Sequence, residues 1–381
     1  MNATRPLDGI TVVSVEHAIA APFCTRHLAD LGARVIKVER PGSGDFARAY
    51  DDRARGLASH FVWVNRSKES LALDLKSPAN RDKLVKLLMR SDVFVQNLAP
   101  GAAERLGLGY EALSKLNPRL IVCDISGYGE NGPYSYKKAY DLLIQSEAGF
   151  LSVTGTDAQP AKSGCSIADI SAGMYAYSTI LAALIQRQRT GKGTRIEVSM
   201  LETMAEWMSF PLYYALDGSP PPVRAGASHA SIFPYGPFAA GDGRVVMIGI
   251  QNEREWESFC NNVLQNRDLK SDPRFDNNMK RSNARAKLTE IIVSAFAALT
   301  AQEVIERLEA ADIANAEVRN MNQVWEHPQL KARNRWVNVE SPVGPLPALL
   351  PPALPSDFSP RMGAVPRVGE HNSAILAELG E

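Results

Sequence analysis

The sequence predicts an α/β fold with a parallel sheet in its first part and a smaller α+β unit after it. Over the first third of the chain, short apolar runs alternate with segments of helical spacing, which is typical of parallel βα units. A length of 381 residues suits about two domains. The turn-rich segment 217–222 (DGSPPP) has the composition of a linker between them.

The first elements follow from β-branched runs and from helical spacing. Residues 9–15 (GITVVSV) are rich in β-branched side chains and predict a strand. Helical spacing over residues 21–31 stops at Gly32, a residue type that favours helix ends. By the same criteria we expect strands at 34–38, 71–75, 93–95 and 120–125, a helix over 78–89 and a short helix after Pro100.

A further helix–strand unit and the smaller α+β unit come next. We expect a long helix over 170–188 that stops at Gly191–Gly193, a strand over 194–198 and a helix over 201–216. In the smaller unit we expect strands at 244–250 and 316–319 and helices at 254–263, 281–298 and 301–311. From Trp336 the chain is proline-rich, up to a closing helix at 368–380, so this tail is expected to return over the first domain.

The expected division of the chain has four parts. They are a large domain (1–200), a linker (201–225), a small α+β domain (226–325) and a return segment that completes the large domain (326–381).

Charge and composition exclude several classes of protein. The chain has 42 Lys+Arg against 42 Asp+Glu and no long basic run, which disfavours a nucleic-acid partner. Its longest strongly apolar stretch, 173–185, is short of the ~20 residues that span a membrane, and the first residues have no signal-peptide pattern.

The cysteines and histidines give no metal pattern. Neither a CxxC pair nor a zinc-ligand spacing occurs among the six scattered histidines and the four distant cysteines, Cys24, Cys123, Cys165 and Cys260. Lone thiols in a chain of this length indicate a reducing compartment, so we expect a cytoplasmic enzyme without a metal.

The usual nucleotide and nucleophile motifs are missing from the places where they would act. No GxGxxG follows the first strand, and neither GxxxxGK[ST] nor GxSxG occurs in the sequence. Residues 17–22 (HAIAAP) stand where a dinucleotide-binding protein has its glycine loop. The strand ends must therefore bind a different ligand.

Asp169 is the first candidate for chemistry, because it comes directly before a long helical run. A carboxylate at that place can cap the helix, since it accepts hydrogen bonds from free backbone N–H groups. The same carboxylate, beside small residues that admit a substrate, can attack an activated acyl carbon. Spacing alone does not choose between a cap and a nucleophile.

Several segments resemble one enzyme family when they are read together. They are GITVVSVEH (9–17), LGARVIKVERPGSGD (31–45), NRSKESLALDLKSP (65–78), VQNLAPGAAERLGLGYEAL (95–113), NPRLIVCDISGYGENGPY (117–134), SIADISAGMYA (166–176) and VGEHNSAILAELG (368–380). With these segments the chain resembles the class III coenzyme A transferases. That family includes formyl-CoA transferase, the carnitine CoA-transferases and the α-methylacyl-CoA racemases.

The resemblance implies a fold and a mechanism. The family fold is a large Rossmann-like CoA-binding domain joined to a small α+β domain, in a homodimer whose two chains interlock like rings. In the transferases, the aspartate that matches Asp169 attacks the acyl-CoA thioester and forms an aspartyl–acyl anhydride. The CoA thiolate then forms an aspartyl-CoA thioester, and a second anhydride with the acceptor carboxylate releases the new acyl-CoA.

The resemblance also implies the residues that contact coenzyme A. Near the adenosine and its phosphates, the matching positions are Arg40, Leu73, Lys76 and Arg105. Near the pantetheine and the active-site helix, they are Asn97, Leu98, Lys138 and Tyr140. The family backbone approaches the thioester at His17, Ala18 and Ile19, which would form an oxyanion site.

Two departures from the family pattern indicate the subgroup. The racemases have a His-Asp pair before the active-site helix, whereas this chain has Tyr140-Asp141 and so lacks the imidazole base. The formyl-CoA branch has a run of glycines where this chain has residues 226–236 (GASHASIFPYG). That segment resembles the branch that acts on C4–C5 dicarboxylates, such as succinate, mesaconate, itaconate or citramalate.

A dicarboxylate acceptor needs a cation for its distal carboxylate, and an arginine serves this purpose best. The candidates are Arg48 and Arg224. His229 and Tyr235 are expected either to contact the acceptor or to cover the site, or else to pack within a loop.

The sequence therefore predicts an acyl-CoA:carboxylate CoA-transferase with a donor such as succinyl-CoA. The alternatives are an α-methylacyl-CoA racemase, an enzyme that moves CoA between two carboxylates of one molecule, and a silent CoA-binding subunit. The retention of Asp169 disfavours the silent subunit.

Overall fold

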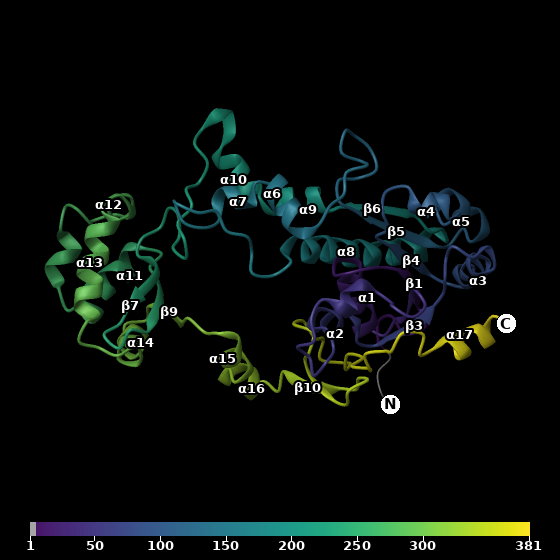
Figure 1. The fold of residues 1–381 in the computed structure, drawn as a ribbon. Coiled ribbons are helices and arrows are strands. Elements are labelled where there is room, and N and C mark those ends of the chain that lie inside the picture. The colour runs from purple at the N-terminus through teal and green to yellow at the C-terminus, as the bar shows by residue number, and fades with distance from the viewer. Residues whose placement is uncertain (1–4) are drawn as a thin grey trace. The chain divides into compact units, whose positions relative to one another are not determined.

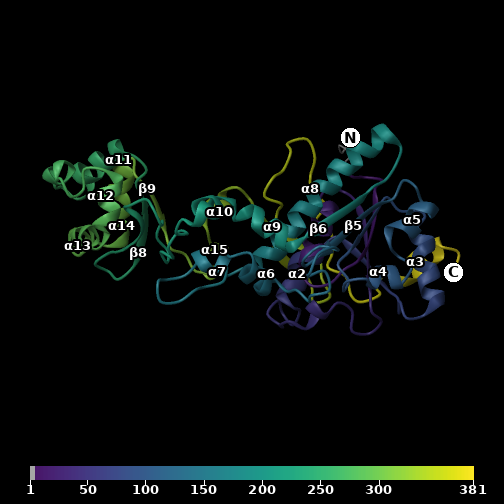
Figure 2. The ribbon, with the colours of Figure 1, turned by 90° about the horizontal axis from the view of Figure 1, so that it is seen from above.

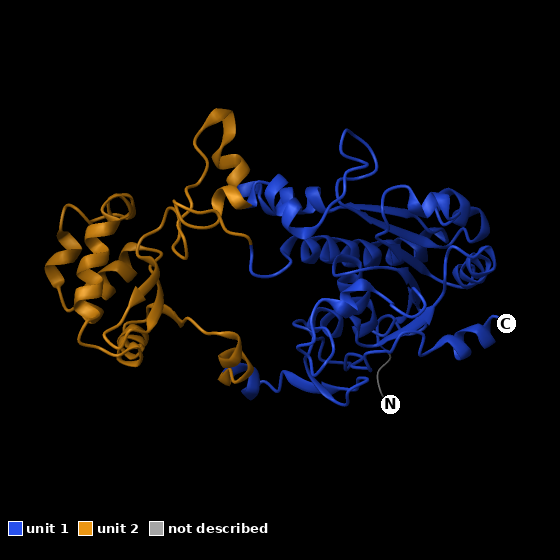
Figure 3. Ribbon diagram, viewed as in Figure 1, with its two compact units in different colours: residues 1–150, 163–210, 329–381 blue, residues 151–162, 211–328 orange. Residues whose placement is uncertain are grey.

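The computed structural model describes residues 5–381, which form two compact units (Figure 3). Unit 1 contains the residues up to 150 together with 163–210 and 329–381. Unit 2 contains residues 151–162 and 211–328.

Unit 1 is built on a six-stranded parallel sheet with the strand order β3-β2-β1-β4-β5-β6. The strands are β1 (Thr11–Val15), β2 (Arg34–Glu39), β3 (Lys68–Ala72), β4 (Val93–Gln96), β5 (Ile121–Ser126) and β6 (Arg195–Ser199). This is the strand order of a Rossmann fold, and the prediction of an α/β fold with a parallel sheet is confirmed. The order reverses between β1 and β4, and ligands bind beyond the carboxyl ends of strands at such a switch point.

Helices cover both faces of this sheet (Figures 1 and 2). Alternate strand residues point to opposite faces, so Val12 packs with α1 (Ala20–Asp30) and α8 (Ile167–Thr190), and Val13 with α3 (Pro78–Leu88) and α5 (Tyr110–Leu116). The other helices before β6 are α2 (Ser59–Asn65), α4 (Ala102–Arg105), α6 (Asp141–Glu147) and α7 (Phe150–Val153), with a 3₁₀ turn at Phe46–Ala49.

Helix α8 packs very closely on α1. A Cβ atom at Gly173 would lie 2.7 Å from the carbonyl oxygen of Ala20, so only glycine fits at this position. Small residues on the same helix face, Ala168, Ala172 and Ala176, are fully buried in the core of unit 1. The close contact fixes the start of α8 relative to the residues that follow β1.

Helix α8 has 24 residues and is long and apolar enough to cross a membrane by length and composition alone. The sequence-based estimate of a shorter apolar stretch, 173–185, was therefore wrong. In the structure, nearly half of its most apolar part is buried within the protein, as in the core helix of a globular domain.

The last part of the chain covers the edge of the parallel sheet in unit 1. It forms a hairpin of β10 (Trp336–Val339) and β11 (Leu346–Leu349), and it ends in α17 (Asn372–Glu378). His371 exchanges two hydrogen bonds of 3.1 Å with the backbone of Ser70 in the edge strand β3. The tail thus pairs N–H and C=O groups that an exposed edge would leave open.

Unit 2 is an α+β structure with a three-stranded antiparallel sheet in the order β7-β8-β9. The strands are β7 (Tyr235–Ala239), β8 (Val245–Gly249) and β9 (Ala314–Glu317). The helices of this unit are α11 (Glu253–Ser258), α12 (Asn278–Asn283), α13 (Arg285–Phe296) and α14 (Ala301–Ala310), with a π-helical turn at Phe259–Val263 and a 3₁₀ turn at Arg267–Ser271. Its core contains large apolar side chains, among them Trp256, Phe259 and Phe296.

The expected helix over 201–216 is divided in the structure. Helix α9 (Met200–Trp207) belongs to unit 1, α10 (Ser209–Tyr214) follows it, and a 3₁₀ turn lies at Leu216–Gly218. Two short helices, α15 (Met321–Trp325) and α16 (Pro328–Ala332), precede the tail. The segment expected as a linker, 201–225, therefore contains regular structure.

Candidate active site

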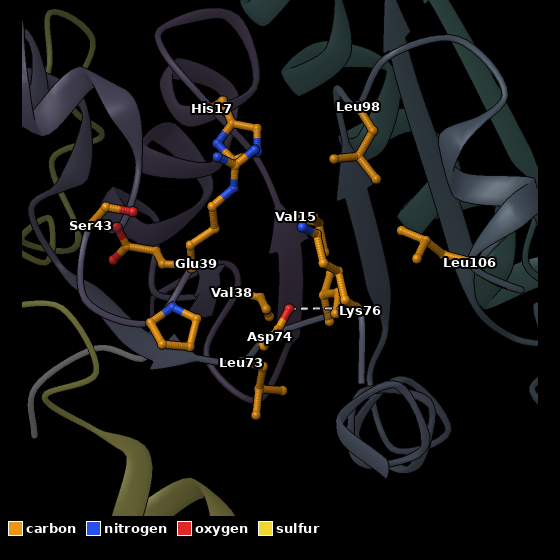
Figure 4. A pocket seen from close by; sticks show the side chains of 13 residues that line it. Val15, His17, Val38, Glu39, Ser43, Leu73, Asp74, Lys76, Leu98 and Leu106 are labelled. Atoms are coloured by element: carbon orange, nitrogen blue, oxygen red, sulfur yellow. Dashed lines mark hydrogen bonds between the residues drawn. The ribbon is translucent and has the colours of Figure 1, made fainter. Parts of the chain in front are cut away.

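A cavity of about 560 Å³ opens at the switch point of the parallel sheet in unit 1 (Figure 4). Its walls come from the last residues of β1 and β2 and from the residues that follow β1, β2, β3 and β4. They include Val15, His17, Val38, Glu39, Arg40, Leu73, Leu75, Lys76, Leu98 and Leu106. Apolar side chains form one wall, and two cations stand among the polar groups. This combination suits a ligand with an aromatic base and phosphates.

Five of the residues predicted to contact coenzyme A line this cavity. They are His17, Arg40, Leu73, Lys76 and Leu98. The Leu73 side chain is buried, whereas Arg40 and Lys76 are exposed and free to meet a phosphate. Residues from four separate segments between positions 17 and 98 thus converge on one cavity.

The other predicted contacts lie outside the cavity lining. Arg105 is exposed and donates to the carbonyl oxygen of Pro100 at 3.4 Å, so it folds back on its own turn. Lys138 and Tyr140 are exposed on the segment that leads into α6. Asn97 bonds to the backbone of His17 through both its amide oxygen and its amide nitrogen.

The backbone at His17–Ile19 was predicted to hold an oxyanion. The N–H of His17 donates to Asn97 Oδ1 at 2.9 Å, and the N–H of Ala18 donates to Asp45 Oδ1 at 3.2 Å. Ala18 has φ +59°, a strained left-handed conformation for alanine. The N–H of Ile19 has no partner among residues 5–381, so it is the one of the three that is free to bind an oxyanion.

A buried chain of charges lies beneath this backbone. Lys37 Nζ donates to Asp45 Oδ2 at 2.8 Å and lies 3.4 Å from Glu16 Oε1, and Lys68 Nζ donates to Glu16 Oε1 at 2.7 Å. All four side chains are buried. Burial raises the pKa of Glu16, but the charges of Lys68 and Lys37 outweigh this and bring it down to about 2. The network therefore holds Asp45 under the Ala18 amide.

The His17 side chain faces the cavity as a neutral imidazole. Burial lowers its pKa, and the nearby charge of Asp45 opposes this only in part. Its ring stacks on Phe46 with 5.4 Å between centroids. Nδ1 is buried, lies 4.0 Å from Asp45 Oδ1 and makes no hydrogen bond within the described residues.

A row of rings begins at His17 in the cavity lining and continues through Phe46. Phe46 contacts Tyr50 with 5.7 Å between ring centroids, and Tyr50 contacts His60 at 5.4 Å. Burial raises the pKa of Tyr50 to about 12, and the charges of Asp45 and Asp169 contribute. Tyr50 thus lies within electrostatic reach of both carboxylates and links the two halves of the candidate site.

Asp169 lies in the first turn of α8, and its side chain does not cap the helix. The carboxylate accepts no hydrogen bond from any residue between 5 and 381. Burial raises its pKa to about 7, and the charge of Asp141 adds to the increase. A carboxylate without hydrogen bonds and with a raised pKa is more nucleophilic than an ordinary one, which favours the second of the two interpretations of Asp169.

Arg48 was a candidate for the distal carboxylate of the acceptor, but the structure engages all of its guanidinium nitrogens. It makes two hydrogen bonds of 2.7–2.8 Å to Glu39 and one of 3.1 Å to the carbonyl oxygen of Pro366. The guanidinium also lies over the ring of Phe61 at 3.7 Å. These contacts give Arg48 a structural role in joining β2 to the tail.

The remaining acceptor candidates lie in unit 2. Arg224 donates two hydrogen bonds of 2.8 Å to the carbonyl oxygens of Thr156 and Asp157. The His229 ring stacks on Tyr235 with 5.3 Å between centroids, and its Nδ1 accepts from the backbone N–H groups of Ser231 and Ile232. Nδ1 is therefore unprotonated, and Nε2 carries the proton of the neutral ring.

Three residues of unit 1 belong to this site although the sequence did not reveal their roles. Asp45 and Tyr50 flank the motif from which Arg48 was chosen, and Asp141 follows Tyr140 directly. A carboxylate three residues before an arginine carries no signal of its own. Their positions depend on how β1, β2 and α8 come together, which no local pattern reports.

Comparison with known proteins gives a consistent result. The model of the family named CoA-transferase family III matches residues 7–372. The human succinyl-CoA:glutarate CoA-transferase is 33% identical over 383 residues, which is 100% of this chain and 87% of that protein. The succinyl-CoA:mesaconate CoA-transferase of Haloarcula hispanica is 32% identical and covers 98% of this chain and 96% of its own length.

A solved structure of a CAIB/BAIF family protein from Brucella suis superposes with a TM-score of 0.88. It is 32% identical in sequence and covers 99% of this chain and 100% of the other. Because the family match extends over almost the whole sequence, the chain is a member of CoA-transferase family III and a CoA-transferring enzyme.

Proposed function

We propose that this enzyme transfers CoA from a donor such as succinyl-CoA to a small C4–C5 dicarboxylate, with Asp169 as the nucleophile. The observation that carries the proposal is the unpaired carboxylate of Asp169 on the first turn of α8, with its pKa raised to about 7. At neutral pH a large fraction of this group is ionised, and the ionised oxygen has a free electron pair to attack a thioester carbonyl.

The proposed reaction needs no proton donor in its first step. An oxygen of Asp169 attacks the thioester carbon, the C–S bond breaks, and the sulfur leaves with the electron pair as CoA thiolate. The thiolate then attacks the Asp169 carbonyl of the anhydride and releases the donor carboxylate. The acceptor carboxylate attacks the aspartyl-CoA thioester, which forms a second anhydride and expels the thiolate. The thiolate then attacks the acceptor carbonyl of this anhydride, which gives the new acyl-CoA and frees the Asp169 carboxylate.

The choice of a dicarboxylate rests on relatives and on unit 2. The curated relatives include transferases for glutarate and for mesaconate. In unit 2, Arg224 stays a candidate for the distal carboxylate, and His229 and Tyr235 stay candidates for contact with the acceptor. Itaconate and citramalate remain acceptors to be tested beside these two.

Coenzyme A is proposed to bind in the cavity of unit 1, with Arg40 and Lys76 at its phosphates and Leu73 against the adenine. We also propose that the enzyme is a homodimer of interlocked chains and that it is located in the cytoplasm. The racemase alternative is disfavoured because Tyr140 replaces the imidazole base.

The test is a mass-spectrometric assay in D₂O. Purified protein is incubated with succinyl-CoA, a chiral 2-methylacyl-CoA and a panel of glutarate, mesaconate, itaconate and citramalate. New acyl-CoA species that form only with an acceptor support the transferase and name the acceptor. Deuterium at the α-carbon of the 2-methylacyl-CoA without CoA exchange would identify a racemase, and Asp169→Ala is the inactive control in either case.

A further inference from the structure

The helix end that carries Asp169 is capped by a second carboxylate, Asp141. Its Oδ1 accepts hydrogen bonds from the backbone N–H of Ala168 at 2.8 Å and of Asp169 at 3.4 Å. Asp141 is the first residue of α6 and stands 28 positions before Asp169. It therefore takes the favourable place for an anion at the start of α8, where the helix dipole and free N–H groups stabilise negative charge.

Asp141 is held in this place from its other side as well. Gln145 Nε2 donates to Asp141 Oδ2 at 2.7 Å, and Gln145 Oε1 accepts from the N–H of Ser163 at 2.9 Å. Gln145 is fully buried, and so is Ile144, which packs in the core with Ala168. The carboxylate of Asp141 is thus fixed at both oxygens by buried groups rather than by chance contacts at the surface.

The arrangement deprives Asp169 of the stabilisation that a first-turn aspartate usually receives. The amides that could solvate its charge already bond to Asp141, and a like charge stands beside it. When Asp169 becomes an anhydride or a thioester, it loses its negative charge, and the repulsion between the two carboxylates disappears. Asp141 therefore destabilises the free nucleophile relative to the covalent enzyme.

We propose that Asp141 is a positioning residue that favours acylation of Asp169, because it occupies the start of α8 and repels the unreacted carboxylate. This inference rests on the proposed function, in which Asp169 is the nucleophile. In the affected step, an Asp169 oxygen bonds to the thioester carbon and CoA leaves as thiolate with the C–S electron pair. The total charge is conserved, but it moves from Asp169 to the sulfur.

Other titratable groups also neighbour Asp169. Tyr50 faces it from the loop after the 3₁₀ turn, and Tyr140 and Asp45 lie near Tyr50. Tyr50 has a pKa of about 12 and stays neutral throughout a neutral pH range. Asp141 is the charged group that contributes to the raised pKa of Asp169, after burial itself.

The experiment compares wild type with Asp141→Asn, which keeps an oxygen acceptor for α8 but removes the charge. Each protein is incubated with succinyl-CoA alone from pH 5 to pH 9, and intact mass spectrometry measures the fraction that carries covalently bound CoA. The rate of CoA transfer to glutarate or mesaconate is measured over the same range. Asp242→Asn is the matched control, since Asp242 Oδ2 accepts the N–H of Ala301 at the start of α14 in unit 2.

For Asp141→Asn, we expect the midpoint of the pH–rate profile to fall by roughly one pH unit. The adduct at pH 8 should fall by about tenfold, because the same charge interaction governs protonation and acylation. Asp141→Glu should regain the wild-type midpoint in part, and Asp242→Asn should match wild type in both measurements. If Asp141→Asn does not fold, Asp141→Ser supplies an uncharged acceptor for the same test.

A uniform loss of rate with an unchanged midpoint and an unchanged adduct fraction would overturn the role of Asp141 and leave the proposed function intact. A wild-type protein that forms neither the CoA adduct nor a new acyl-CoA would instead overturn the proposed function.

Discussion

Asn97 and His17 exchange two hydrogen bonds at the switch point of the parallel sheet. The N–H of His17 donates to Asn97 Oδ1 at 2.9 Å, and Asn97 Nδ2 donates to the carbonyl oxygen of His17 at 3.0 Å. One side chain thus completes the pairing of β1 with β4 beyond the last residues of both strands. The contact fixes the backbone from which the cavity wall and the free N–H of Ile19 begin.

This contact predicts a binding defect in Asn97→Ala. The variant leaves the N–H and C=O of His17 without partners, so the backbone loses its fixed position and each group costs about 1–3 kcal/mol if it stays buried. We expect KM for the acyl-CoA to rise by roughly tenfold or more. Steady-state kinetics with succinyl-CoA measures this.

Asn117→Ala is the matched control, because Asn117 also bonds to backbone carbonyl groups in unit 1, at Leu88 and Ser91, but outside the cavity. It should lower stability and leave KM unchanged. An equal rise of KM in both variants would show that loss of stability, not the His17 backbone, is the cause.

The raised pKa of Asp169 predicts that the native carboxylate lowers stability. The pKa of Asp169 in the folded protein, about 7, is above its ordinary value of 3.8. The stability that this raised pKa contributes is therefore full below pH 3.8 and is lost as pH rises through 7. Asp169→Asn has no group to ionise at this position, so its stability does not fall in this way as the pH rises. We expect it to be more stable than wild type by about 1–3 kcal/mol at pH 8 and equal to it near pH 4.

Urea unfolding at the two pH values measures the difference. The sign of the pH dependence is the decisive result, since an amide that merely packed better would stabilise the protein equally at both. A variant that is less stable than wild type at pH 8 would contradict the raised pKa.

The sequence alone predicted the parallel sheet of unit 1 well, because its strands are buried on both faces and appear as continuous apolar runs. Strand β3 was placed three residues too late, at 71–75 instead of Lys68–Ala72. Lys68 and Ser70 are polar yet buried, and Lys68 is paired with Glu16. A strand whose inward side chains serve a charge network gives no apolar signal.

The place of the candidate site in the fold could be predicted from the sequence, but the contacts of its side chains could be predicted only in part. His17, Leu98 and Asp169 follow strand ends or begin a helix, so a resemblance in sequence is enough to place them. The partners of a carboxylate are set by tertiary packing instead. Asp141 caps a helix 28 residues away, and Arg48 binds Glu39 rather than a substrate, and neither contact has a local signature.

Arg48 gives a prediction on stability rather than on acceptor binding. Arg48→Ala leaves the buried carboxylate of Glu39 without its two guanidinium bonds, although Ser70 still donates to it at 2.7 Å. We expect a loss of roughly 3 kcal/mol in the free energy of unfolding. Arg53→Ala, at an exposed arginine of the same segment, should stay within about 0.5 kcal/mol of wild type.

Urea unfolding of both variants and the acceptor KM of the folded enzymes decide between the two roles. A stable Arg48→Ala protein with a raised acceptor KM would show instead that Arg48 binds the acceptor carboxylate.

Glu16 gives the sharpest prediction on acid stability, because it holds Lys37 and Lys68 together in the interior of unit 1. Glu16→Gln leaves two buried cations without their shared anion, so we expect a loss of about 3–5 kcal/mol at pH 7. The folded pKa of about 2 is below the model-peptide value of 4.5. The contribution of Glu16 is therefore complete above pH 4.5 and is lost as pH falls toward 2.

The difference in unfolding free energy between wild type and Glu16→Gln should thus be constant from pH 7 to about pH 5 and shrink below it. Glu69→Gln is the matched control, since Glu69 pairs with Arg34 on the same sheet but is partly exposed. The unfolding free energy of Glu69→Gln should be lower than that of wild type by only about 1 kcal/mol. Equal losses in the two variants would mean that the buried network adds no more than a surface ion pair, and that Asp45 and the Ala18 amide are held by the backbone alone.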